Sequence, residues 1–192
     1  MSLKPSLTFQ RVGSPSSDHT LEIFIDYQCG RAKAIVQALN NFIVPHIKEG
    51  GKLHNKLSVI LRLAPQNWFA GIYPPLYDNK ASFLNVVVQD LSATQIRKQA
   101  AELAKPFTTA SVLDAITNKT HASLGNNGPN TSTPDLQYNI KYARQLSIQH
   151  TPSVALDGII QGHVFDGGVV NGIPSSWGQT EWDAWVEKEV LA

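Results

Sequence analysis

The sequence predicts an α/β protein in which a mixed sheet is interrupted by an inserted block of helices. Three observations support this prediction. Apolar, β-prone segments flank one helical segment in the first third of the chain. The middle of the chain shows helical periodicity without strand patterns, and β-prone segments return near the C-terminus, before a last helix. The predicted order is therefore β-β-α-β, then helices, then β-β-α.

The N-terminal part contains three predicted strands and one helix. Leu7–Val12 is a short β-prone run, and Thr20–Asp26 has the nearly continuous apolar character of a buried central strand. Arg31–His46 places apolar residues at helical spacing, and Leu57–Ala64 is another buried strand. Because a helix connects the second strand to the third, we expect these two strands to lie parallel.

Helical patterns dominate residues 66–147, where Ser92 and Gln95 form a predicted capping box. The helices predicted there are Asn79–Asp90, Ser92–Ala104, Thr109–Thr120 and Thr133–Leu146. We expect this block to be a helical insertion. The remaining residues, 1–65 and 148–192, then form one discontinuous domain.

The C-terminal part predicts a hairpin and a helix. Ser153–Gly158 reads as a strand followed by a tight turn, and Ile159 starts its hairpin partner. The final helix, Thr180–Leu191, carries a tryptophan-rich inner face formed by Trp182, Trp185 and Val186.

Composition excludes several functional classes. Apolar residues make up 42% of the chain and charged residues 16%, with a formal net charge of +1, so nothing predicts binding to nucleic acid or to an anionic membrane. No secretory signal or transmembrane segment is evident, and we expect a cytoplasmic protein. The six histidines lack metal-ligand spacing, so no metal site is predicted. The oligomeric state is left open.

The single cysteine, Cys29, is the most informative residue. It follows an apolar strand that ends in Asp26-Tyr27-Gln28, and a helix-forming stretch comes next. Unpaired N–H groups at a helix start favour thiolate over thiol. A disulfide oxidoreductase would carry its second cysteine three positions later, where this chain has Ala32. Any function must therefore use one sulfur or none.

Two motifs, together with the element order, resemble the DsbA-like branch of the thioredoxin fold. The first is Glu22–Cys29, Glu-Ile-Phe-Ile-Asp-Tyr-Gln-Cys, and the second is His150–Gly158, His-Thr-Pro-Ser-Val-Ala-Leu-Asp-Gly. The resemblance covers the whole domain in order, although only these motifs are specific. It implies a thioredoxin-like fold with a helical insertion, and a cis Thr151–Pro152 bond in a loop that faces the sulfur. An extended peptide would pair with the backbone of that loop.

The chain departs from the family pattern at two positions beside the sulfur. Gly30 replaces the usual Pro, and Ala32 replaces the usual resolving Cys. The first change loosens the helix start. The second removes intramolecular dithiol chemistry, so that only an external thiol could release a mixed disulfide at Cys29.

Each residue near Cys29 has a functional and a structural interpretation. Cys29 is the catalytic candidate, against the alternative of an inert buried side chain. Arg31 either adds positive potential at the sulfur or is simply solvated. Asp26 either moves protons or caps the turn, and His150 either assists the thiolate or points to water. Glu22 either tunes the thiol from behind the site or is a surface or paired acid.

Tyr27, Thr151 and Pro152 are the candidate substrate-binding residues. Other aromatic side chains either line the same groove or pack the core. These are Trp68, Phe69, Tyr73 and Tyr77. His163 belongs to no motif.

Two classes of function remain open. In the first, Cys29 makes the chain a monothiol thiol–disulfide oxidoreductase that uses an external thiol such as glutathione, or a glutathione-dependent transferase or isomerase. In the second, the chain is a redox-inactive module that binds a peptide or partner. No resident cofactor is required, and glutathione would act as co-substrate. The expected partner is glutathione or a protein or peptide that bears a thiol or disulfide.

Overall fold

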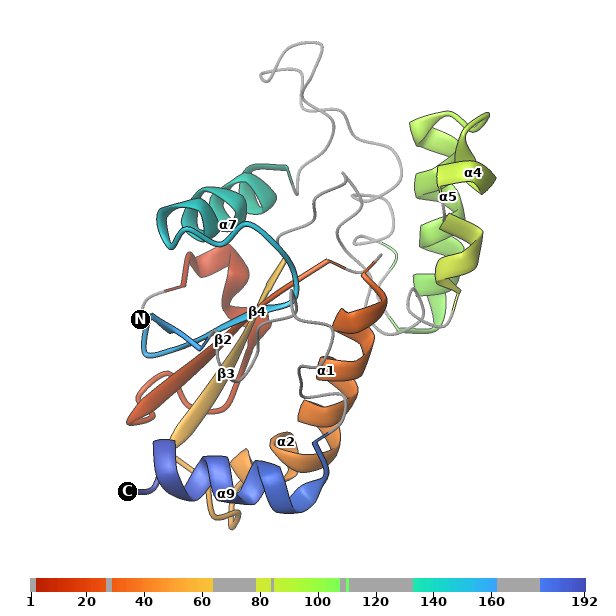
Figure 1. Cartoon of the computed structure of the whole chain (residues 1–192). Helices are drawn as coiled ribbons and strands as arrows, with labels where there is room; N and C mark the ends of the chain where they lie inside the picture. The colour runs from red at the N-terminus through yellow and green to blue at the C-terminus, as the bar shows by residue number, and fades with distance from the viewer. Residues whose placement is uncertain are drawn as a thin grey trace.

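The computed structural model shows a five-stranded mixed sheet with helices on both faces (Figure 1). It describes residues 3–26, 29–63, 79–83, 85–107, 110, 133–161 and 177–192. The strand order is β1-β3-β2-β4-β5, so β2 lies at the centre. Within the described residues, no helix combines the length and hydropathy that crossing a bilayer requires.

The strands confirm the predicted topology around the central strand. β2 (His19–Ile25) pairs in parallel with β3 (Leu57–Leu63), as a connection through a helix requires. β4 (Ser153–Leu156) lies antiparallel to β2 on its other side, and β5 (Ile159–Ile160) forms the predicted hairpin with β4. All of β2 except its first residue is buried, which explains its nearly continuous apolar sequence.

Side chains of β2 alternate between two separate cores. Leu21, Ile23 and Ile25 belong to the larger core, which includes residues of the helices that follow β2 and end the chain. Phe24 points to the opposite face and joins a smaller cluster with Ala143. This alternation follows from the period of two in a strand.

The larger core is covered by α1 (Gly30–Phe42), α2 (Val44–Ile47) and α9 (Gln179–Glu189). A single helix over Arg31–His46 was predicted, but the structure divides it at Ile43, because Pro45 has no N–H for the helical hydrogen bond. The predicted inner face of the last helix is confirmed, since its residues are buried. These are Trp182, Trp185 and Val186.

The predicted N-terminal strand is largely wrong. Residues Pro5–Gln10 form a 3₁₀ helix, η1, and only Arg11–Val12 pair with β3 as β1. Pro5 presets a helical backbone, and Leu7 and Gln10 are buried three residues apart, which is the 3₁₀ repeat. Their spacing matches a helical turn better than a strand.

The middle of the chain is helical where it is described. α5 (Ala93–Ala104) begins at Ser92 with the predicted capping box, and α7 (Thr133–Gln145) matches its prediction closely. Instead of one helix over Asn79–Asp90, the described residues form the short turns η2 (Lys80–Phe83) and α4 (Asn85–Val88), where three consecutive valines disfavour helix. A further short turn, η3, covers Lys105–Phe107.

The predicted helix Thr109–Thr120 lies outside the described residues, apart from Ala110. The division of the chain at these bounds, with 66–147 as the insertion and 1–65 and 148–192 as one domain, remains a prediction.

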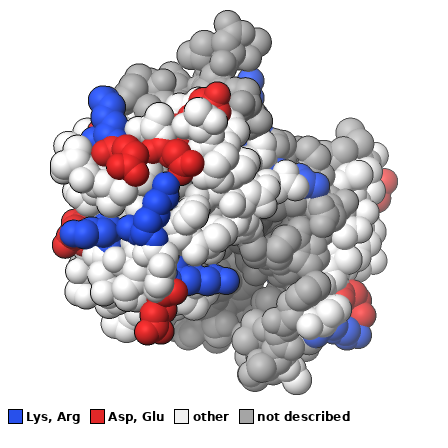
Figure 2. Space-filling view, turned by 90° about the horizontal axis from the view of Figure 1, so that it is seen from below, with Lys and Arg blue, Asp and Glu red and all other residues white. Residues whose placement is uncertain are grey.

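Charges of both signs lie side by side on the face seen in Figure 2. Exposed ion pairs of the described residues include Lys52 with Asp183, at 2.6 Å, and Lys56 with Asp18, at 2.8 Å. These partners lower the pKa of Asp18 and of Asp183 through hydrogen bonds from the lysines. Such exposed pairs contribute little to stability.

Two glycines provide a matched test of the packing of the turn after β1 against α2 and β3. Gly13 has φ +96°, and a Cβ there would lie 2.8 Å from Ile47 Cγ2, whereas Gly50 has φ +82° and open space. We expect Gly50→Ala to cost about 1 kcal/mol from backbone strain alone. Gly13→Ala should cost a further ~1–3 kcal/mol from overpacking, measured by urea unfolding. Equal costs would show that the contact at Gly13 relaxes freely.

Candidate functional site

Cys29 is the residue from which α1 starts. Its backbone is extended, with φ −73° and ψ 118°, and it occupies the N-cap position. Its N–H donates to the Asp26 carbonyl at 3.0 Å, and its own carbonyl accepts from the Ala32 N–H at 3.1 Å. The thiol is free and half-buried against the edge of the larger core. The turn thus presents the sulfur at the first turn of the helix.

The sulfur meets the Thr151–Pro152 loop. The Cys29 thiol donates a hydrogen bond to the Thr151 carbonyl, with 3.3 Å between Sγ and O, and the Thr151–Pro152 peptide bond is cis. The β2–β4 register explains the approach, because Phe24, the last but one residue of β2, pairs with Ser153, the first residue of β4. Segments distant in sequence therefore meet at the C-terminal end of the central strand β2.

The other residues predicted near the thiol differ in how deeply their side chains are buried. Gly30 and Arg31 begin α1, and the Arg31 side chain is exposed in a first turn that contains no acidic residue. Ala32 is fully buried in the larger core. Asp26 is buried at 6% exposure, and His150 is exposed while its carbonyl accepts from Ser153 Oγ at 2.7 Å.

The placement of these residues does not decide their functional roles, which remain predictions. Several candidates lie outside the described residues: Tyr27, Trp68, Phe69, Tyr73, Tyr77 and His163.

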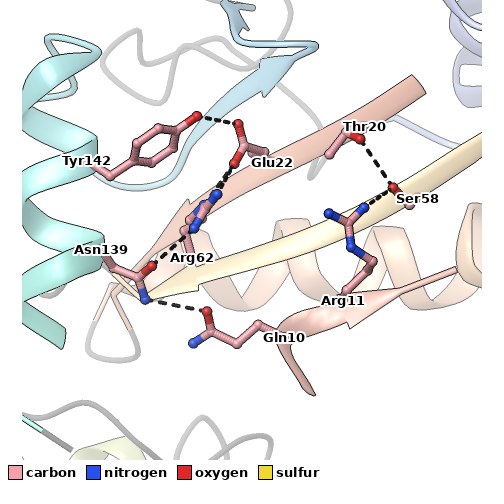
Figure 3. Close-up of polar contacts among 8 residues, drawn as sticks. All are labelled: Gln10, Arg11, Thr20, Glu22, Ser58, Arg62, Asn139 and Tyr142. Carbon is pink, nitrogen blue, oxygen red and sulfur yellow. Dashed lines mark hydrogen bonds and ion pairs between the residues drawn. The ribbon is translucent and has the colours of Figure 1, made fainter. Parts of the chain in front are cut away.

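Behind the sheet lies a buried ion pair that sequence analysis did not fully predict (Figure 3). Arg62 of β3 donates to Glu22 Oε1 from Nε at 2.8 Å and from Nη2 at 2.5 Å, and both side chains are at most 1% exposed. Tyr142 of α7 donates from Oη to Glu22 Oε2 at 3.0 Å. Both carboxylate oxygens therefore have partners, as a buried charge requires.

The ion pair extends into a polar cluster between the sheet, α7 and η1. The Arg62 guanidinium lies 4.4 Å from the centre of the Tyr142 ring and donates to Asn139 Oδ1 at 3.4 Å. Asn139 in turn donates to Gln10 Oε1 at 3.4 Å. The aromatic face, the amide and the carboxylate together satisfy the guanidinium.

This geometry confirms that Glu22 is a paired acid, and it places the pair on the α7 face of the sheet, whereas Cys29 begins a helix that packs on the other face. A role of Glu22 in tuning the thiol remains a prediction. Arg62 was missed as its partner. A lone Arg inside the apolar Leu57–Leu63 strand was the available signal, since a buried cation needs an anion.

The same face carries a second polar group nearer the start of β2. Arg11 donates from Nη1 to Ser58 Oγ at 2.6 Å, and Thr20 and Ser58 share a hydroxyl contact at 3.3 Å. Burial, and then the charge of Arg62, lower the pKa of Arg11. Burial, followed by the charge and hydrogen bond of Glu22, raises the pKa of Tyr142 to about 12. Tyr142 is therefore a neutral donor at ordinary pH.

Within the described residues, no group of three or more histidine, cysteine, aspartate and glutamate side chains could hold a metal ion.

Comparison with known proteins gives the fold. No protein-family model matches the chain, and no curated protein matches it by sequence. Its structure is similar to that of oxidised BdbD from Bacillus subtilis, with a TM-score of 0.51 and 15% identity over 95% of this chain and 93% of that chain. It is also similar to MdbA, a thiol-disulfide oxidoreductase from Corynebacterium matruchotii, with a TM-score of 0.50 and 15% identity over 87% and 84% of the two chains.

At this level of identity the likeness establishes the architecture. The chain has a thioredoxin-like α/β fold with a helical insertion, which confirms the predicted fold class.

The buried pair predicts a strongly non-additive double-mutant cycle. Glu22→Leu leaves a buried guanidinium without its anion and should cost about 3–5 kcal/mol in the free energy of unfolding. Adding Arg62→Leu should recover most of that loss, because an apolar pair needs no counter-charge. Urea unfolding of the four proteins measures the coupling. Additive costs would show that the two side chains act independently.

Proposed function

We propose that this chain is a DsbA-like thiol–disulfide exchange protein that works with one sulfur. Cys29 forms a mixed disulfide with a protein or peptide, and an external thiol such as glutathione releases it. The proposal is carried by one observation, the 3.3 Å contact between the Cys29 sulfur at the start of α1 and the carbonyl next to a cis-proline. The likeness in fold to a thiol-disulfide oxidoreductase supports it.

The proposed exchange has two steps. The Cys29 thiol first loses its proton to solvent, and the thiolate attacks one sulfur of a substrate disulfide. The Cys29–substrate disulfide forms as the old S–S bond breaks, and the other substrate sulfur leaves as thiolate. Glutathione thiolate then attacks the substrate sulfur of the mixed disulfide and expels Cys29 as thiolate. The substrate leaves joined to glutathione, and no net oxidant is consumed.

The residues around the sulfur fit these steps. The exposed Arg31, in a first turn without acidic residues, favours the approach of an anionic thiol such as glutathione. The Thr151 segment directly precedes β4, so an extended substrate could continue the strand pairing there. Ala32 lies fully buried where a second sulfur would resolve the intermediate, which is why release is assigned to an external thiol.

The first test is adduct formation. Incubating the reduced protein with glutathione disulfide should add the mass of one glutathionyl group, located at Cys29 by peptide mass spectrometry. The native thiol should react with glutathione disulfide faster than the same thiol in urea. Cys29→Ser is the control and should give no adduct while keeping the circular dichroism spectrum.

A different outcome would favour the alternative function. If Cys29 reacts no faster in the folded protein than in the unfolded one, the proposal of an exchange activity fails. The chain would then act as a redox-inactive module that binds a peptide or partner, or the thiol would serve another glutathione-dependent reaction.

A second test restores the missing sulfur. Ala32→Cys places a thiol one turn after Cys29, close enough on a helix start for a disulfide. We expect the variant to form an intramolecular disulfide and to reduce insulin with dithiothreitol at least ~10-fold faster than the parent protein, because attack by a neighbouring thiol replaces a bimolecular step.

Gln37→Cys is the matched control, since it adds an exposed thiol further along the same helix, beyond the reach of Cys29. It should leave the rate of insulin reduction unchanged. An Ala32→Cys protein that forms the disulfide but gains no activity would count against the proposed exchange function.

A further inference from the structure

We propose that the hydroxyl of Tyr142 positions the Thr151–Pro152 loop against Cys29, although Tyr142 itself lies on the other face of the sheet. It is a positioning residue that acts through the backbone of this loop. The functional meaning of this role rests on the proposed exchange function. The structural claim concerns the hydrogen bond between Cys29 and Thr151.

Tyr142 ties the last turns of α7 to the two central strands. Its hydroxyl donates to Glu22 of β2 at 3.0 Å, and its ring lies under the guanidinium of Arg62 from β3. The ring also stacks on Phe24, with 6.1 Å between ring centres. The hydroxyl is the polar part of this anchor, and the ring is its apolar part.

The segment that leads from Tyr142 to the loop is itself held firmly. The Leu146 N–H donates to the Tyr142 carbonyl at 3.2 Å, and the Ile148 N–H donates to the Ala143 carbonyl at 2.9 Å. Between them, Ser147 turns the chain with φ +58°. Leu146 and Ile148 both pack against the small cluster around Ala143. A displacement of α7 would therefore be transmitted along this segment.

The far end of the loop is fixed by β4. Ser153 donates from Oγ to the His150 carbonyl at 2.7 Å and pairs with Phe24 of β2. The loop is thus held at one end by α7 and at the other by β4, and both of these elements contact β2. Because Cys29 follows the end of β2, the same strand sets the position of the sulfur and of the carbonyl that it meets.

The experiment uses the reduced full-length chain and its single thiol. With one cysteine in the sequence, the Raman S–H stretching band reports Cys29 alone, and its frequency falls when the thiol donates a hydrogen bond. Tyr142→Phe removes the hydroxyl and keeps the ring contacts, and circular dichroism checks that it folds. Tyr138→Phe, one turn earlier on α7, is the matched control.

We expect the S–H band of Tyr142→Phe to shift towards the frequency of the urea-unfolded chain, while Tyr138→Phe keeps the wild-type band. A Tyr142→Phe band at the wild-type frequency overturns the proposal, even if the melting temperature falls, because stability alone does not move this band. An equal shift in both variants also overturns it. No disulfide substrate is present, so failure of the exchange activity would be seen separately, in the glutathione experiment.

Discussion

The antiparallel pairing of β4 with β2 is the interaction on which the candidate site depends. It places Ser153 beside Phe24, so that the Thr151–Pro152 loop lies near the C-terminal end of β2. The parallel pairing of β2 with β3 then requires the chain to cross over through α1, whose first turn begins at Cys29. Both halves of the site are therefore consequences of strand register.

The parts of this arrangement that could be predicted from sequence have local signals. An apolar strand, a polar turn and a helix start identify the place of Cys29, whereas the loop that faces the sulfur was expected only from the resemblance of Thr151–Pro152 and the strand after it to the DsbA-like motif. The crossover rule then supplies the parallel pairing. The local signals and the crossover rule need no knowledge of the packed interior, whereas the approach of the loop to Cys29 was expected from the family pattern alone.

The parts that escaped prediction depend on which face of the sheet a residue occupies. Glu22 and Arg62 read as isolated charges until the register shows that both point towards α7. A strand shifted by one residue would place the same Glu22 on the α1 side, behind the thiol. The place of Gln10 was also not predicted, because this side chain is buried against Asn139, which lies far away in the sequence.

Ala32 stands where dithiol proteins have a second cysteine. As a result, two properties that are separate in those proteins are linked in this one. A protein with two neighbouring thiols can be oxidised while remaining a single free molecule. In this chain, one thiol can enter a disulfide only by attaching to something else. Oxidation of Cys29 to a disulfide is therefore the same event as its covalent attachment to a partner. The concentration of partners determines how much of the protein is oxidised in this way and how much is attached.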